Sequence, residues 1–148
     1  MKAYHLIIII ALLLTASVCS AQESYEKTAK MILGTWNLDS LYIGSQELPE
    51  PILRKLYEKT QETKKFTTYY FGEDGKYINK TQTNTTEGSW KLSQTGDTLT
   101  LILPNKTIIN KILQISADSL TIEPQDKTKE VENSKIFMVK PTNLPIEP

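Results

Sequence analysis

The chain has little of the chemistry that most exported domains and most enzymes use. Its 148 residues include one cysteine, Cys19, and one histidine, His5. Both lie in a leader-like segment at the N-terminus, and removal of that segment would leave neither a thiol nor an imidazole. Such a chain can form no disulfide, no zinc site of the Cys/His type and no nucleophilic machinery of the Ser-His or Cys-His kind.

Net charge is also lacking, because 17 Lys and Arg residues balance 17 Asp and Glu residues. Arg54 is the single arginine, and the lysines form no basic stripe that would track a phosphate backbone. Nucleic-acid binding is therefore not expected.

The carboxylates form no catalytic or metal-binding pattern. Glu73, Asp74 and Asp97 fall in predicted hairpin turns, where short acidic side chains commonly bond to backbone amides. The sequence has no calcium-loop pattern and no pair of carboxylates at a spacing that suits acid–base catalysis. It therefore predicts no enzyme, no cofactor and no bound metal.

Long apolar runs are scarce, and the most prominent lies at the N-terminus. Lys2 precedes an unbroken apolar run from Leu6 to Leu14, which is too short for a good transmembrane span. Cys19-Ser20-Ala21 places small residues before a cut ahead of Gln22. We expect residues 1–21 to be a signal peptide and the protein to be exported, either periplasmic or secreted. The alternative is a lipid anchor at Cys19, and no transmembrane span is expected in either case.

Residues 22–148 are enough for a single domain with one core. Ser24 is a candidate N-cap for a short N-terminal helix that Gly34 would end. After it, short segments of alternating apolar and polar residues are separated by turn signals such as Asp74-Gly75. The predicted strands cover residues 35–43, 65–71, 76–82, 87–93, 98–103, 107–115, 120–123 and 135–140.

One helical segment interrupts these strands, from Ile52 to about Thr63. Its apolar residues form a narrow stripe that is too short for a core element: Ile52, Leu53, Leu56 and Tyr57. The connection over residues 44–64 is the longest between predicted strands, and long connections often act as lids. We therefore expect ligand access at this end, with the stripe sealing the opening.

The connections after Lys65 are short, which predicts that consecutive strands pair in antiparallel fashion. Eight strands in this order close into an up-and-down, or meander, barrel without exposed sheet edges. The predicted fold class is therefore all-β, with a helix before the first strand and another between the first two strands. A barrel of this size has room for packed side chains or one small ligand.

Several phrases, taken in order, resemble a known family. Gly34-Thr35-Trp36, at the start of the first strand, resembles the G-x-W signature of the lipocalins. The run from Tyr70 to Tyr77 (YFGEDGKY), Gly88-Ser89-Trp90 and the run from Asp118 to Ile122 (DSLTI) resemble small exported lipocalin-like proteins of bacteria. The resemblance covers residues 33–140 and implies an eight-stranded barrel more than an activity.

The resemblance also implies how the barrel is closed. Trp36 would close one end, and residues 52–63 would lie at the open end. In lipocalins an arginine near the end of the last strand packs over this tryptophan, whereas this chain has only Lys135 and Lys140 there. The T-D-Y turn and the usual disulfide of the family are absent.

Aromatic residues in the strands are the first candidates for contact with a ligand. The predicted ligand-binding residues are Trp36, Tyr42, Tyr69, Phe71, Tyr77, Trp90 and Leu101. The alternative is that the tryptophans fill the barrel core and that the other aromatics reflect ordinary strand composition.

Polar residues interrupt the apolar pattern of the strand over residues 107–115. If this strand is regular, either Asn110 or Lys111 points into the barrel. A polar group that points inward needs a partner, and a ligand could supply it. The alternative is a β-bulge near Asn110 that turns both side chains outward.

These features favour an exported lipocalin-like binding protein for a small hydrophobic or amphipathic ligand. The alternative is a packed barrel that acts as a structural or protein-interaction accessory of the cell envelope, without a small-molecule ligand. The expected partner is accordingly a small hydrophobic ligand or an envelope protein. An enzyme that uses Tyr, Lys and carboxylates ranks last, because no catalytic constellation is visible.

Overall fold

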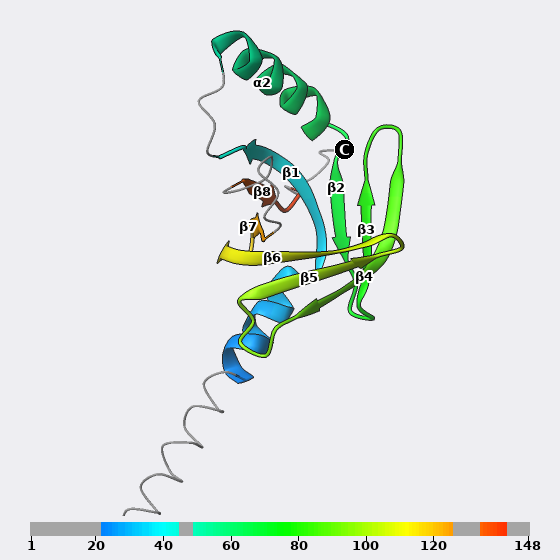
Figure 1. The fold of residues 1–148 in the computed structure, drawn as a ribbon. Coiled ribbons are helices and arrows are strands. Elements are labelled where there is room, and N and C mark those ends of the chain that lie inside the picture. Colours follow the sequence, from blue (N-terminus) through cyan, green and yellow to red (C-terminus); the bar gives the residue numbers. More distant parts are fainter. Residues whose placement is uncertain (1–21, 45–48, 126–133, 142–148) are drawn as a thin grey trace, which may run out of the picture.

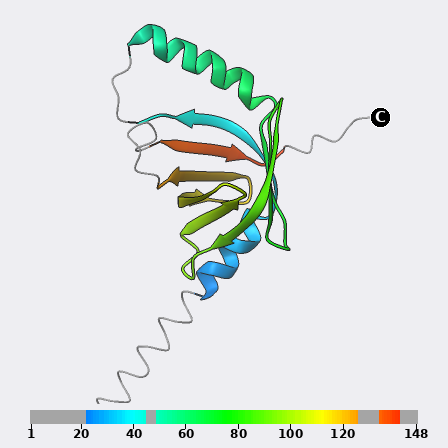
Figure 2. The ribbon, with the colours of Figure 1, turned by 45° about the vertical axis from the view of Figure 1, so that its right-hand side comes forward.

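The structure of the protein, a computed structural model, describes residues 22–44, 49–125 and 134–141. Eight strands pair antiparallel in chain order, and the last strand pairs with the first to close a barrel (Figures 1 and 2). The predicted fold class is confirmed. The predicted signal peptide, residues 1–21, and the lipidation alternative at Cys19 lie outside the described residues.

The elements follow the predicted order along the chain. A helix over residues 22–32 precedes the first strand, and helix α2 (Glu50–Lys64) connects the first two strands. The strands are β1 (Gly34–Tyr42), β2 (Thr68–Phe71), β3 (Lys76–Lys80), β4 (Thr85–Leu92), β5 (Thr98–Leu103), β6 (Lys106–Ile115), β7 (Ser119–Pro124) and β8 (Lys135–Val139).

The predicted start of the second strand, at residue 65, is wrong, because β2 begins at Thr68. Helix α2 continues to Lys64, and the backbone N–H groups of Lys65 and Phe66 bond to carbonyls in its last turn. The Thr67 hydroxyl also donates to the Thr63 carbonyl, over 2.9 Å. These local hydrogen bonds hold residues 65–67 in a turn that the alternating pattern had assigned to the strand.

The N-terminal helix packs against one end of the barrel, beside β4 and β5 (Figure 1). Gly96, in the turn between these strands, has a positive φ of 73°, and a Cβ there would lie 3.1 Å from Thr28 Oγ1. A glycine is therefore required both by the turn and by the approach of the helix. The helix already includes residue 22, so Ser24 lies within it and is not its N-cap. The Ser24 hydroxyl instead donates to the Thr95 carbonyl over 3.1 Å.

Trp36 lies at the centre of this closed end. Its side chain is fully buried, and its indole N–H donates to the Ile32 carbonyl over 2.7 Å. The Nζ of Lys140, just after β8, lies 5.0 Å from the centroid of the indole ring. A cation over an indole face is favourable. Lys140 therefore takes the position that the lipocalin resemblance assigns to an arginine.

The remaining core lies close to this end. The Phe71 ring meets the Trp90 ring edge-to-face, with 5.9 Å between centroids, and Leu99 and Leu120 are fully buried beside them in the same cluster. At Gly88, strand β4 approaches β5 so closely that a Cβ would collide with the carbonyl oxygen of residue 102. These contacts pack the interior of the barrel near its closed end.

Candidate ligand-binding cavity

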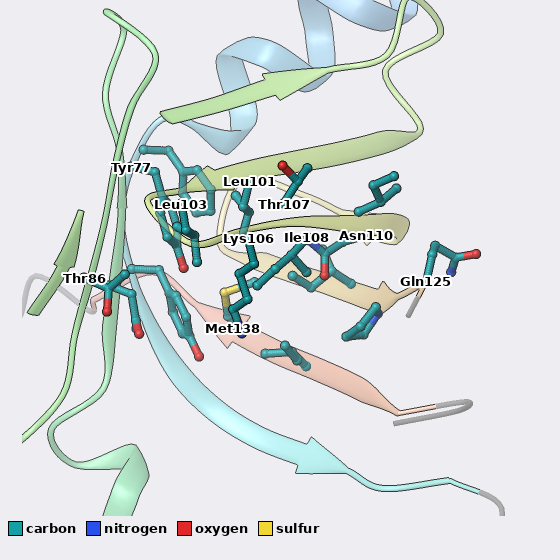
Figure 3. Close-up of a pocket in the computed structure, with 17 residues that line it drawn as sticks. Tyr77, Thr86, Leu101, Leu103, Lys106, Thr107, Ile108, Asn110, Gln125 and Met138 are labelled. Carbon is teal, nitrogen blue, oxygen red and sulfur yellow. The ribbon is translucent and has the colours of Figure 1, made fainter. Parts of the chain in front are cut away.

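A cavity of about 690 Å³ lies inside the barrel, and Trp36 is not among the residues that line it. Its walls come from β2 to β8, and Figure 3 shows the side chains that surround it. Much of the lining is apolar or aromatic, and Phe71 and Met138 in it lie toward the closed end: Phe71, Tyr77, Leu101, Ile122, Ile136 and Met138. Toward the β5–β6 turn and the end of β7 it becomes polar, with Asn79, Thr86, Lys106, Thr107 and Gln125.

The structure brings four of the seven predicted binding residues together around this cavity. Tyr69 and Phe71 come from β2, Tyr77 from β3 and Leu101 from β5. Their order follows from the register, since Phe71 pairs with Tyr77 across the hairpin. The ring centroids of Phe71 and Tyr77 are 5.4 Å apart, and the two rings form one wall of the cavity.

The other three predicted residues lie outside the lining. Trp36 and Trp90 belong to the closed end, and the Trp90 indole N–H donates to the Gly72 carbonyl over 2.9 Å. Tyr42 is 54% exposed near the end of β1, with the Nζ of Lys135 5.9 Å from its ring centroid. The two tryptophans therefore pack the barrel, which was the alternative considered for them.

Asn110 points into the barrel and Lys111 points out. Asn110 is 1% exposed and lines the cavity, and its side-chain amide donates to the Leu99 carbonyl over 3.3 Å. Strand β6 does carry an irregularity, but it falls between Ile112 and Gln114. The strand is therefore regular at Asn110, and the alternative in which a bulge turns both residues outward is wrong.

The polar lining residues apart from Asn110 were not singled out from the sequence, although strand alternation contains the signal. Asn79 lies two residues after Tyr77, and Lys106 lies four residues before Asn110. Residues separated by two or four positions share one face of a strand. Alternation alone could not show which part of that inner face remains unfilled.

Two phenols lie in the cavity wall, that of Tyr77 buried and that of Tyr69 partly buried. Burial raises the pKa of Tyr69 to about 12, because the charged phenolate would lose its hydration. Burial also raises the pKa of Tyr77, and the nearby Tyr69 adds to that effect. Both hydroxyls are therefore neutral at physiological pH and can donate or accept a hydrogen bond.

Alkaline pH should destabilise the barrel through these two phenols. An unfolded tyrosine ionises near pH 10, whereas Tyr69 in the fold ionises at about pH 12. Stability from the neutral phenols is complete below pH 10 and is lost as the pH rises toward 12. Urea unfolding at about pH 9 and about pH 11 should show this loss, and Tyr69→Phe with Tyr77→Phe should reduce it. An equally large loss in the double variant would contradict the assignment.

The acidic residues of the turns make hydrogen bonds that stabilise the turns themselves. The Asp97 carboxylate accepts hydrogen bonds from the hydroxyls of Ser93 and Thr95, at 2.7 Å each, and of Thr98, at 3.0 Å. These bonds lower the pKa of Asp97 to about 2. The Asp74 carboxylate accepts a backbone N–H two residues along the chain. Within residues 22–44, 49–125 and 134–141, no three His, Cys, Asp or Glu side chains are grouped as metal ligands would be.

Helix α2 does not seal the cavity in this structure. It packs beside β1, on the side of the barrel away from the N-terminal helix (Figures 1 and 2), and none of its residues is buried or lines the cavity. Ile52, Leu53 and Tyr57 of the apolar stripe are 46%, 48% and 66% exposed. Neither described helix is long and apolar enough to span a membrane.

Comparison with known proteins identifies the fold. No protein-family model matches the sequence, and no curated protein matches it. A solved structure of a DUF4847 family protein from Bacteroides vulgatus is similar, with a TM-score of 0.52 and 14% identity, over 74% of this chain and 93% of that one. A lipocalin-like protein from Bacteroides uniformis has a TM-score of 0.50 and 16% identity, over 74% of this chain and 98% of that one. The predicted likeness to bacterial lipocalin-like proteins is thus confirmed at the level of the fold.

Proposed function

We propose that this lipocalin-like barrel binds one small hydrophobic or amphipathic molecule in its cavity. The observation that carries the proposal is the cavity itself, about 690 Å³ in volume and lined by side chains from seven strands. Binding cavities for small molecules typically measure about 300–1,000 Å³ and combine apolar walls with a few polar groups. Both features are present here.

The physical driving force would be the burial of apolar ligand surface. Each Å² removed from water contributes roughly 25 cal/mol, and the wall around Phe71, Leu101, Ile122 and Met138 offers such surface. Asn79, Thr86 and the phenols of Tyr69 and Tyr77 would fix the orientation of the ligand. The lining residues that the structure describes form no constellation of nucleophile, base and acid, so we propose binding and not catalysis.

A second candidate function rests on the outer surface. Near the end of β1 and on α2, several large apolar side chains are exposed: Tyr42, Ile43, Ile52, Leu53 and Tyr57. Surfaces of this kind often mark protein–protein contacts. This favours an interaction with an envelope protein as the alternative function.

We also propose that the barrel acts after export, either periplasmic or secreted. The support is the sequence pattern of residues 1–21, and the alternative is a lipid anchor at Cys19. Mass analysis of the mature N-terminus should find Gln22 as the first residue. An acylated Cys19 would instead make this a tethered barrel.

The binding proposal is tested by titration with N-phenyl-1-naphthylamine, a neutral probe whose fluorescence rises in apolar surroundings. We expect a saturable rise with an affinity on the order of micromolar. A Leu53→Ser, Leu56→Ser variant of α2 is the matched control for binding at the outer stripe, and its affinity should stay within about twofold, a difference under about 0.5 kcal/mol. If the probe did not bind at all, or if its binding disappeared in the α2 variant, the cavity would not be the site.

A further inference from the structure

The polar mouth of the cavity carries a positive charge. Lys106, Ile108 and Asn110 occupy alternate positions on one face of β6, and the burial of Asn110 shows that this face is the inner one. Lys106 pairs with Leu103 at the β5–β6 turn, and both residues line the cavity. Its side chain is therefore placed at the rim, directed to the barrel interior (Figure 3).

Lys106 is the only charged side chain among the described residues that line the cavity. The two salt bridges between described residues join Arg54 to Glu58 and Lys76 to Glu87, so neither involves Lys106. The described lining includes no aspartate or glutamate. The electrostatic character of the mouth is therefore positive, in a chain whose formal net charge is zero.

The polarity of the cavity changes along the barrel axis. Thr86 and Gln125 stand with Lys106 toward the mouth, whereas Phe71 and Met138 lie toward the closed end. A ligand that matches this gradient has an apolar tail and a polar head with negative charge. A lysine ammonium binds a carboxylate through charge-assisted hydrogen bonds while the tail is buried.

We infer that the ligand is an anionic amphiphile, a chain carboxylate whose head binds Lys106 and whose tail fills the apolar base. This inference rests on the proposed binding function and names the ligand class for the same site. The carboxylate remains near water at the rim, so its hydration is only partly lost. That position avoids the large cost of a fully buried charge.

The test uses three ligands with one tail and different heads: decanoate, decanol and decyltrimethylammonium. Each displaces N-phenyl-1-naphthylamine from the full chain at about pH 8, where a carboxyl group is ionised. Decanoate should bind most tightly and the cationic ligand least tightly. Lys106→Gln should weaken decanoate by about three- to tenfold, as expected for an ion pair at a partly exposed site, and leave decanol unchanged.

Lys111→Gln is the matched control, because Lys111 lies on the same strand, has the same charge and is exposed outside the barrel. It should leave all three affinities unchanged. If decanoate and decanol bound equally and Lys106→Gln changed neither, the carboxylate assignment would be wrong while the binding function stood. If none of the three ligands displaced a probe that itself binds, the anionic-amphiphile inference would fail. If the probe did not bind either, the binding function would fail with it.

Discussion

Replacing Trp36 with alanine should lower the free energy of unfolding by about 3–5 kcal/mol, more than any other Trp or Tyr truncation. The side chain is fully buried at the closed end of the barrel, so its removal leaves a cavity that the strands cannot easily collapse. It also leaves the Ile32 carbonyl without its indole donor and the Lys140 ammonium without its aromatic partner. The substitution therefore removes the contacts of β1 with both the N-terminal helix and the segment after β8.

Urea unfolding followed by far-UV circular dichroism measures this effect without relying on tryptophan fluorescence. Trp36→Phe is the informative companion, because it keeps most of the apolar volume and removes only the N–H group. Its cost should be about 1–3 kcal/mol, the usual penalty for an unpaired buried acceptor together with a small cavity. A cost below about 1 kcal/mol for Trp36→Ala would show that this residue does not hold the closed end.

Filling the mouth of the cavity should remove ligand binding. Thr86→Trp combined with Ile108→Trp places two indoles on the inner faces of β4 and β6, where both residues line the cavity. The affinity for N-phenyl-1-naphthylamine should fall at least about tenfold, which corresponds to about 1.4 kcal/mol. The fold should persist, because the new side chains enter space that the native residues leave open.

The control places the same two side chains outside the barrel. Thr85 precedes Thr86 on β4, Lys111 lies three residues after Ile108 on β6, and both are exposed. Thr85→Trp with Lys111→Trp therefore adds equal apolar surface without filling the interior. Its affinity should match that of the unmodified protein. Equal losses in both double variants would indicate that the strands tolerate no tryptophan there, and equal retention would place the binding site elsewhere.

The strand order could be predicted from the sequence because local signals agreed with the global fold. Alternation in β5 and the Asp74-Gly75 turn fixed the register of neighbouring strands, and short turns fixed their antiparallel order. The start of β2 could not be predicted in this way. The hydrogen bonds of Thr67 and its neighbours to the last turn of α2 overrode a period-two pattern.

The lining of the candidate site could be predicted only in part, for a physical reason. Alternation identifies the inner face of each strand, and it correctly placed Tyr69, Tyr77 and Leu101 inside. It does not show how far the closing side chains reach along the barrel. That depends on how the N-terminal helix and Lys140 pack around Trp36, which is a tertiary property. The extent of the open interior was therefore visible only in the three-dimensional structure.

The most direct test of a ligand-binding interior is an isotope-filtered NOE experiment on labelled protein saturated with unlabelled N-phenyl-1-naphthylamine or decanoate. The cavity account predicts intermolecular NOEs from the ligand to methyl groups of Leu101, Ile108 and Met138, which line the interior. It predicts none to Ile52 and Leu53 on the exposed face of α2. NOEs confined to α2, with none to the interior methyl groups, would contradict the account and favour the outer surface as the functional face.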